Sequence, residues 1–325
     1  MCLRNINFLL IFILFLSTQG CYEIMKEDAN GVVPVYYFTV RLKVFPEGKP
    51  ILMEDSSFVY FSDREVYYII NIYNIYAGVS HRNIYVPHHI DCLCNTDSQL
   101  FAVTHKEYNQ YVFYTIDKEN CFIVDSFSIG LPCNNIRRCL NLGNRFFLGT
   151  EEGLIVVDVE EGEVETFYFP SISNMLMYDQ MILLISTEKF GLFSIKENNI
   201  ILTSTNTTDG TCFAKGEGTK VIFFNKNSYK LCITSLYSLL YGRIETESAF
   251  DSINVNDIEV KGDSVLLATD KLTYWLVCLP DREPAVWETI GQGGRWVILD
   301  RGCVHLILKD SRKVFDFIFR NERLR

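Results

Sequence analysis

The stretch HHIDCLC, residues 88–94, is the one dense cluster of side chains in this sequence that could bind a transition metal. On a strand, Cys92 and Cys94 point to the same face because side chains alternate, so the two thiols could share a metal ion. The remaining candidate ligands in the cluster are His88, His89 and Asp91. A closed zinc site needs a second pair of ligands, and no Cys-x-x-Cys motif occurs in the chain. We therefore predict a disulfide or packed thiols at this cluster and assign no metal site.

An acidic segment that follows the run LIVVDV is the second candidate for ion binding. Its carboxylates are Asp158, Glu160, Glu161, Glu163 and Glu165. A calcium loop of the EF-hand type needs oxygen ligands at alternating positions around a central glycine and a terminal glutamate, and this spacing is absent. The pattern favours a solvated turn between two strands.

Nucleophilic catalysis has no recognisable motif, because the sequence contains no Gly-x-Ser-x-Gly elbow. His81, His105 and His305 have no motif neighbours. Since His105 and His305 lie in apolar runs that recur along the chain, we interpret them as satisfied structural residues, with a pore-lining position as the alternative. Paired acids for glycoside hydrolysis stay open, because such pairs meet only in the fold. No catalytic residue, cofactor-binding residue or cofactor is assigned.

The recurring apolar runs define the elements that must position all of these residues. Most runs end in a small or hydroxyl residue followed by a charge, and a second apolar run follows each after two to six residues. The first runs of the pairs are residues 57–63, 99–105, 145–151, 181–187, 220–226, 264–270 and 303–310. Charged or asparagine-rich turns follow several of the second runs, which is typical of antiparallel strands.

Seven copies at a spacing of about 40 residues predict an all-β chain folded as a seven-bladed β-propeller. The last copy ends near the C-terminus without an outer strand, and the alternating segment 37–45 is expected to pair with segment 314–319 and so close the final blade. Six or eight blades stay open as alternatives. One short helix is expected within residues 235–242. The glycine-rich stretches 215–218 and 291–294 lack the lysine and helix context of a phosphate loop, and we interpret them as turns between blades.

Two strand-like segments carry a family resemblance. Phe315-Asp316 and Val157-Asp158 stand where the Trp-Asp pair of a WD repeat would lie, so the chain resembles the propeller superfamily that includes WD-repeat proteins. No copy contains Trp-Asp itself, and no Gly-His pair precedes the strands. Residues 146–159, FFLGTEEGLIVVDV, are also similar to blades of citron-homology domains and of sensor propellers in two-component regulators. These resemblances imply protein binding or regulation rather than catalysis.

Charge and the N-terminal sequence bear on partners and compartment. The chain has 325 residues and a formal net charge of −10 without a block of basic residues, which argues against nucleic-acid partners. Residues 1–20 combine Arg4, an apolar core from Phe8 to Leu16 and small residues, as in a cleaved signal peptide that leaves Cys21 near the mature N-terminus. An uncleaved anchor and a buried segment are the alternatives. After cleavage, residues 21–325 are expected to form one domain without stable membrane insertion.

The secretory prediction has two further consequences. Ten of the 11 cysteines follow Cys2, and an oxidising compartment allows one to three disulfides among them. Asn206, in the sequon Asn206-Thr207-Thr208, is the glycosylation candidate. The first functional hypothesis is a secreted or secretory-pathway propeller, in the ER lumen or outside the cell, that binds a protein without catalysis. The alternatives are a hydrolase or lyase with its site in the central channel and an intracellular scaffold of the citron-homology type.

Overall fold

The computed structural model describes the chain in the following segments. They are residues 22–24, 36–41, 49–52, 57–64, 67–74, 79–96, 99–120, 122–204, 210–262, 264–277, 285–290, 293–300, 303–307 and 313–318. The predicted signal peptide (1–20), Cys21 and Asn206 lie outside the described residues. No helix in these segments is long and apolar enough to cross a membrane.

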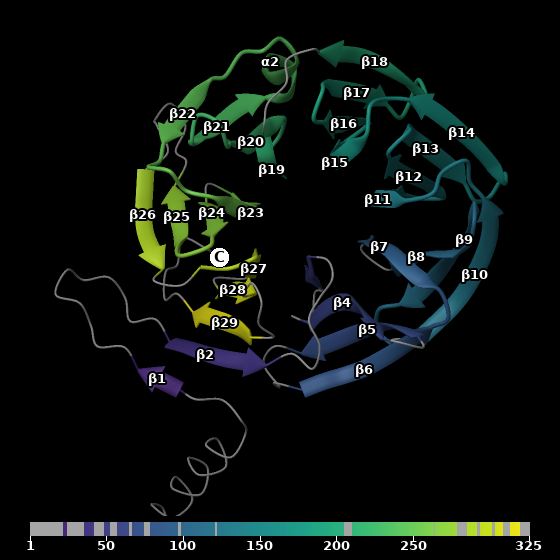
Figure 1. Cartoon of the computed structure of the whole chain (residues 1–325), viewed down its shortest axis with the longest axis horizontal. Helices are drawn as coiled ribbons and strands as arrows, with labels where there is room; N and C mark the ends of the chain where they lie inside the picture. Colours follow the sequence, from purple (N-terminus) through teal and green to yellow (C-terminus); the bar gives the residue numbers. More distant parts are fainter. Residues whose placement is uncertain are drawn as a thin grey trace, which may run out of the picture.

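The described strands form seven antiparallel sheets placed around a central axis (Figure 1). Six of these sheets have four strands, and the seventh has five in the order β1-β2-β29-β28-β27. The innermost strands are β3 (Ile51–Leu52), β7 (His89–Asn95), β11 (Ile136–Leu142), β15 (Ile172–Tyr178), β19 (Gly210–Lys215), β23 (Val255–Lys261) and β27 (Trp296–Asp300). The second strands are β4 (Ser57–Arg64), β8 (Gln99–Glu107), β12 (Arg145–Thr150), β16 (Met181–Ser186), β20 (Lys220–Asn225), β24 (Ser264–Thr269) and β28 (Cys303–Ile307).

The outer half of each sheet continues the same order. The third strands are β5 (Tyr67–Asn74), β9 (Gln110–Asp117), β13 (Gly153–Asp158), β17 (Phe190–Ser194), β21 (Lys230–Ser235), β25 (Thr273–Val277) and β29 (Lys313–Ile318). The fourth strands are β6 (Val79–Val86), β10 (Phe122–Gly130), β14 (Glu163–Tyr168), β18 (Asn199–Ser204), β22 (Thr246–Ala249), β26 (Ala285–Ile290) and β2 (Tyr36–Arg41). β1 (Tyr22–Ile24) pairs with the outer edge of β2. The predicted short helix is confirmed as α2 (Leu236–Leu240).

Burial explains why the sequence pattern was strongest in the two middle strands. β12 and β13 are buried at almost every position, whereas β14 is exposed or half-buried throughout. Both faces of a middle strand are covered by neighbouring sheets, so the strand reads as a continuous apolar run. The paired runs of the sequence analysis are these second and third strands, and an inner strand precedes each pair.

The hydrophobic core lies between the sheets rather than at the centre of the disc. Each of the five clusters of buried residues in the described segments combines side chains from two neighbouring sheets. Phe147 and Phe193, for example, are fully buried and meet edge to face between the β11–β14 and β15–β18 sheets. Burying one such side chain stabilises the fold by about 1.5–3 kcal/mol. Packing of one sheet on the next therefore holds the ring together.

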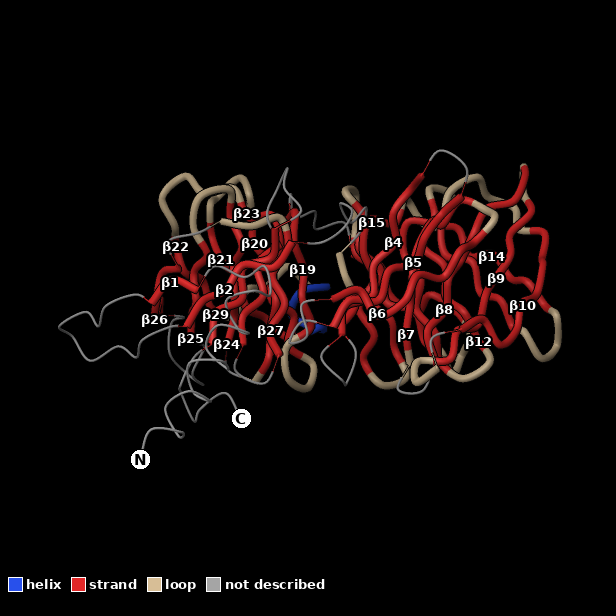
Figure 2. Tube along the Cα trace, turned by 90° about the horizontal axis from the view of Figure 1, so that it is seen from below, coloured by secondary structure: helices blue, strands red, loops and turns tan. Residues whose placement is uncertain are grey.

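The turns lie at the two ends of the disc (Figure 2). We letter the strands of each sheet A to D from the inner edge outward. The end of the disc with the turns between the second and third strands is then the BC end, and the opposite end, with the connections between the third and fourth strands, is the CD end. Bonds between the first residues of successive inner strands show that neighbouring sheets run in the same direction. Asn256, near the start of β23, donates to the carbonyl of Gly294 just before β27, at 2.9 Å, and Cys212 of β19 contacts the carbonyl of Val255 in β23 at 3.6 Å.

One interpretation of a glycine-rich stretch was wrong. Residues 215–218 do not connect two sheets but form the hairpin between β19 and β20 of one sheet, where Gly216 N–H donates to the carbonyl of Lys220 at 2.9 Å. The stretch 291–294 follows β26 and precedes β27, so it does join two sheets. A Cβ on Gly293 would lie 2.5 Å from the Thr269 carbonyl oxygen, which explains why this connection needs a glycine.

Candidate functional site

A hydroxyl or amide side chain at the end of the second strand organises the BC end. Thr150 Oγ1 donates to the carbonyl of Gly153 at 3.0 Å and accepts from the backbone N–H groups of Glu152 and Gly153, each at 3.1 Å. Three further residues make the equivalent turn bonds in their sheets: Ser186, Thr269 and, through its side-chain amide, Asn225. The hydroxyl that ends most copies of the sequence repeat is therefore a turn-forming group.

A β-bulge recurs at the start of five described inner strands, where one residue is left out of the ladder. The bulged residues are Asp91, Arg137, Ser173, Thr211 and Asn256. Bulges often redirect a side chain, and all five residues are polar. We call them the inner-bulge residues.

Two inner-bulge residues join their own sheet to the next one. Arg137 donates to Glu151, the residue after Thr150, and at 2.7 Å to Ser171 Oγ in the connection that leads to β15. Asn256 likewise donates to Asp270 Oδ1 at 3.0 Å, the residue after Thr269, and to Gly294 O before β27. The inner-bulge residue thus fixes the BC turn of its sheet against the start of the next sheet.

Asp91 and His105 occupy the same two positions in the β7–β10 sheet, because His105 follows Thr104. The side chain of Asp91 is only 6% exposed, and its Oδ2 has no hydrogen-bond partner among the described residues. Burial raises the pKa of Asp91 to about 6, although the charges of His89 and His105 and a backbone hydrogen bond from Ile136 act in the opposite direction.

The prediction that His105 is a satisfied structural residue was wrong in one respect. Its ring stacks on Tyr111 with the centroids 4.9 Å apart, but its Nε2 is buried without a hydrogen-bond partner in the described part of the chain. Its register partner on the inner strand is His89, and Asp91 lies two residues further along that strand. His81 lies on β6 and His305 on β28, and both side chains lie outside the described residues.

The acidic turn after β13 is held by its own backbone. Asp158 Oδ1 accepts from the N–H groups of Glu160 and Glu161 at 3.1 and 3.2 Å, and Oδ2 accepts from Arg145 Nε at 3.0 Å. These bonds, that of Glu161 foremost, lower the pKa of Asp158. Glu165 accepts from Asn198 of the next sheet at 2.8 Å. The acidic segment is thus a hairpin turn, as its spacing indicated, in which Asp158 forms the turn.

A second charged cluster joins three sheets at the inner strands. Lys49, just before β3, places its Nζ 2.8 Å from Asp257 Oδ2 and 2.7 Å from Glu259 Oε2, both on β23. Asp257 also accepts the backbone N–H of Val297 in β27 at 3.0 Å. Burial raises the pKa of Glu259, and the positive charge of Lys49 opposes that rise. The cluster therefore connects the β3–β6 sheet, the β23–β26 sheet and the five-stranded sheet.

Among the third-to-fourth connections that the structure describes, the one between β21 and β22 departs from the regular repeat. β21 and β22 are joined by residues 236–245, which include α2, whereas β13 and β14 are joined by only residues 159–162. The buried face of α2 consists of Leu236, Leu239 and Leu240, which pack in the cluster between the β15–β18 and β19–β22 sheets. This apolar face holds residues 236–245, which we call the insertion, against the disc.

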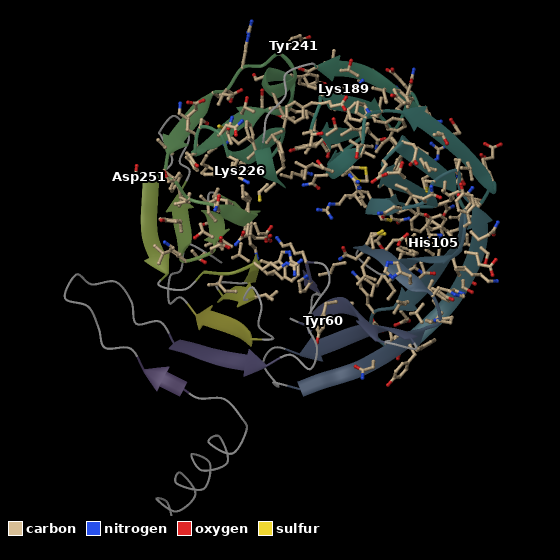
Figure 3. The ribbon with its side chains drawn as sticks, viewed as in Figure 1. Tyr60, His105, Lys189, Lys226, Tyr241 and Asp251 are labelled. Atoms are coloured by element: carbon tan, nitrogen blue, oxygen red, sulfur yellow. The ribbon has the colours of Figure 1, made fainter. Side chains whose placement is uncertain are left out.

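α2 and its C-cap residue carry two exposed tyrosines. Tyr237 is 48% exposed and Tyr241 67% exposed, and their spacing of four residues places them on one side of the helix. Figure 3 shows Tyr241 at the outer rim of the disc. Ile244, 38% exposed, follows three residues later. Solvent-exposed tyrosines on a rigid element are typical of protein-binding surfaces.

Backbone and side-chain bonds at both ends of α2 hold these tyrosines in place. Ser235 caps the helix by accepting the N–H of Ser238 at 3.2 Å. At the other end Arg243 N–H donates to the carbonyl of Ser238 at 2.8 Å, and Thr234 Oγ1 donates to the carbonyl of Arg243 at 2.7 Å. The backbone of the insertion is therefore held by hydrogen bonds at both ends, so little backbone entropy is left to lose on binding.

Comparisons with known proteins define the fold class. No model of a known protein family matches the chain, and no curated protein sequence matches it. Three solved structures are similar in fold. U3-55K aligns with a TM-score of 0.65 at 9% identity, over 87% of this chain and 98% of that chain. A chain of the mitotic checkpoint complex aligns with a TM-score of 0.69 at 8% identity, over 92% and 96%. The WD40 repeats of RRP9 align with a TM-score of 0.65 at 10% identity, over 92% and 100%.

The chain is therefore a WD-repeat-like β-propeller, as the resemblance of its strands indicated. The all-β, antiparallel, four-stranded architecture predicted from the repeat is confirmed. Identities of 8–10% define the fold alone and no more specific family.

Proposed function

We propose that this protein is a secreted or secretory-pathway propeller that binds another protein without catalysing a reaction, and that α2 is its docking element. The observation that carries the proposal is the pair Tyr237 and Tyr241, held on a helix that interrupts an otherwise regular repeat. The net charge of −10 disfavours nucleic acid as the partner. A propeller also supplies the rigid frame that such recognition needs.

The proposed propeller comprises residues 21–325 as one domain with seven blades, closed by the N-terminal strand. Support comes from the antiparallel register of β2 and β29, in which six residue pairs from Tyr36↔Ile318 to Arg41↔Lys313 face each other. In the closed ring, β2 covers the edge of β29 that would otherwise be free to pair with another chain.

Cross-linking tests this closure. Val40 and Val314 are register partners, so a Val40→Cys, Val314→Cys double variant should form a disulfide that mass spectrometry detects. Val40→Cys with Val304→Cys is the matched control, because β28 lies one strand beyond β29 and about 10 Å from β2. A cross-link in the control but not in the register pair would contradict the closure.

Affinity purification tests the docking element. The tagged full chain is recovered from its native source in three forms: unaltered, Tyr237→Ser with Tyr241→Ser, and Tyr108→Ser. Tyr108 is 77% exposed in the BC turn of the β7–β10 sheet, so it reports on the opposite end of the disc. We expect a protein partner to co-purify in stoichiometric amount with the unaltered chain and with the Tyr108 variant. The amount that co-purifies with the Tyr237 and Tyr241 double variant should be at least tenfold lower. Loss of the partner with the Tyr108 variant alone would show that the docking site lies at the BC end instead.

The compartment is tested on the same preparation. A mature N-terminus near Cys21, or a glycan on Asn206, supports the secretory placement and eliminates the intracellular scaffold of the citron-homology type. An unprocessed N-terminus together with unmodified Asn206 would favour the intracellular alternative. Protein binding through α2 is independent of this outcome.

A channel enzyme is the second candidate function, and the pair Asp91 and His89 favours it. A buried carboxyl with a pKa of about 6 that lies 3.6 Å from a histidine nitrogen is a typical acid–base arrangement. The other inner carboxylates, Asp257 and Glu259, are already paired with Lys49. Turnover of chromogenic glycoside or ester substrates that Asp91→Asn abolishes would support the enzyme. Equal rates in the variant and the unaltered chain would reject this site.

A further inference from the structure

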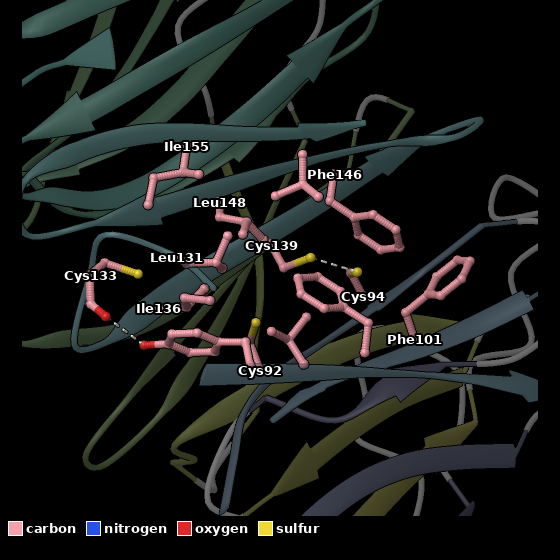
Figure 4. Close-up of a cluster of buried hydrophobic side chains, with 14 residues drawn as sticks. Cys92, Cys94, Phe101, Leu131, Cys133, Ile136, Cys139, Phe146, Leu148 and Ile155 are labelled. Atoms are coloured by element: carbon pink, nitrogen blue, oxygen red, sulfur yellow. Dashed lines mark hydrogen bonds between the residues drawn. The ribbon is translucent and has the colours of Figure 1, made fainter. Parts of the chain in front are cut away.

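Three cysteines meet between two neighbouring sheets. Cys92 and Cys94 lie on β7, and Cys139 lies on β11, the inner strand of the next sheet. All three are buried in one hydrophobic cluster, together with Phe101 and Phe146 (Figure 4). The sequence analysis placed Cys92 and Cys94 on one face of a strand, and their common burial confirms it.

The sulfurs of Cys94 and Cys139 are closer than a non-bonded packing contact. Their Sγ atoms lie 2.8 Å apart and are drawn facing each other in Figure 4. A disulfide has a sulfur–sulfur distance of about 2.05 Å, so a small side-chain movement joins the pair.

Other described cysteines have different surroundings. The Sγ of Cys212 contacts the carbonyl of Val255 at 3.6 Å, and the Sγ of Cys232 contacts the carbonyl of Lys230 at 3.7 Å. The carbonyl of Cys133 accepts from the Tyr111 hydroxyl at 3.3 Å. Within the described segments, the β7–β11 cluster is the place where one cysteine sulfur faces another.

We propose that Cys94 and Cys139 form a disulfide that joins the inner strands of two adjacent blades. The oxidant is a small or protein disulfide, such as oxidised glutathione. One thiolate attacks the oxidant and forms a mixed disulfide, and the second thiolate displaces the remaining oxidant thiolate. The two cysteines lose two protons and two electrons, and the oxidant disulfide is reduced to two thiols. In the cell, this step rests on the secretory placement proposed above; in a glutathione buffer it does not.

Burial determines when the bond forms. Burial raises the pKa of Cys139 well above that of a free thiol, so the folded protein holds little reactive thiolate. We expect oxidation before the two sheets close over the cluster, and slow reduction afterwards. Because the bond closes a loop between residues 45 apart in sequence, it restricts the unfolded chain, and the oxidised protein should melt about 5–10 °C higher than the reduced protein.

Mass spectrometry of the full chain tests the proposal. The protein is refolded in reduced and oxidised glutathione, alkylated in denaturant and digested. The expected product links the Cys139 peptide to the peptide that holds Cys92 and Cys94, with fragment ions that assign Cys94. The link should persist in Cys92→Ala and in the matched control Cys232→Ala, and disappear in Cys94→Ala. The unaltered chain alone already decides the pairing if a variant does not fold.

Two results would overturn the disulfide: complete alkylation of Cys139 after oxidative refolding, or fragment ions that assign the link to Cys92. Protein from the native source separates the two proposals. A processed N-terminus with reduced Cys94 and Cys139 would reject the disulfide and keep the secretory placement. An unprocessed N-terminus, together with the link in glutathione buffer, would reject the placement and keep the disulfide chemistry.

Discussion

Asp91 and His105 lie at the same two positions of their sheet at which Arg137 binds Glu151 in the next sheet, and Asp91 Oδ1 lies 3.6 Å from His89 Nε2. In the first sheet the carboxylate lies on the inner strand, and in the second sheet it lies in the BC turn. Burial raises the pKa of Asp91 to about 6, so the charge at this position changes near neutrality and the stability of the sheet should depend on pH.

Asp91 gives the fold a stability that falls as pH rises. Its folded pKa of about 6 exceeds the ordinary 3.8, so its contribution is fully present below pH 4 and is lost as pH rises through 6. A shift of this size corresponds to at most about 3 kcal/mol. We expect Asp91→Asn to be more stable than the unaltered chain at pH 8 and nearly equal at pH 4, by urea unfolding. Asp251→Asn, at an exposed carboxylate, is the control, and an unchanged pH profile in Asp91→Asn would contradict the assignment.

The hydroxyl of Thr150 should account for much of the stability of its BC turn. Thr150 is fully buried, and its Oγ1 bonds Gly153 and Glu152. Thr150→Ala leaves these buried backbone groups unpaired, and we expect a loss of about 1–3 kcal/mol in the free energy of unfolding. Thr150→Ser keeps the hydroxyl and should lose less than half as much. Equal losses in the two variants would show that the methyl group, not the turn bond, matters.

Gly153 permits a close approach that no other residue allows. Its φ is +145°, and a Cβ there would lie 2.2 Å from the carbonyl oxygen of Phe167. Gly153→Ala should therefore cost about 3 kcal/mol or more, because the outer strand β14 must move. Gly162 has a φ of +69° with open space around it, so Gly162→Ala should cost only about 1 kcal/mol. Thermal unfolding of both variants separates the steric effect from the conformational effect. Similar losses of stability in the two variants would contradict a steric clash at Gly153.

Lys49 should stabilise the contact between the β3–β6 sheet and the β23–β26 sheet. Replacement by methionine leaves Asp257 and Glu259 as adjacent carboxylates without their cation, and we expect a loss of about 1–2 kcal/mol at pH 7. The loss should shrink toward pH 4 as Glu259, whose pKa is raised by burial, becomes protonated. Lys49→Arg keeps the charge and serves as the control in urea unfolding at both pH values. A loss that is independent of pH would indicate packing by the lysine stem instead.

The sequence by itself determined the strand pairs, the short helix and the propeller class. These follow from local chemistry: middle strands are covered on both faces and are continuously apolar, and a hydroxyl such as that of Thr150 ends the second strand where the turn needs an acceptor. The inner strands were not predicted as separate elements, because a mixed segment such as Arg137 to Leu142 has neither clear alternation nor a continuous apolar run.

Only the tertiary structure decided the contacts between blades. The bonds of Arg137 and the approach of Cys94 to Cys139 each join residues that lie far apart in the sequence, and sequence spacing does not encode such distances. The glycine stretch 215–218 was misplaced for the same reason, since a glycine turn reads alike within one sheet and between two. Local pattern fixes which strands form, whereas side-chain packing between sheets fixes which residues meet.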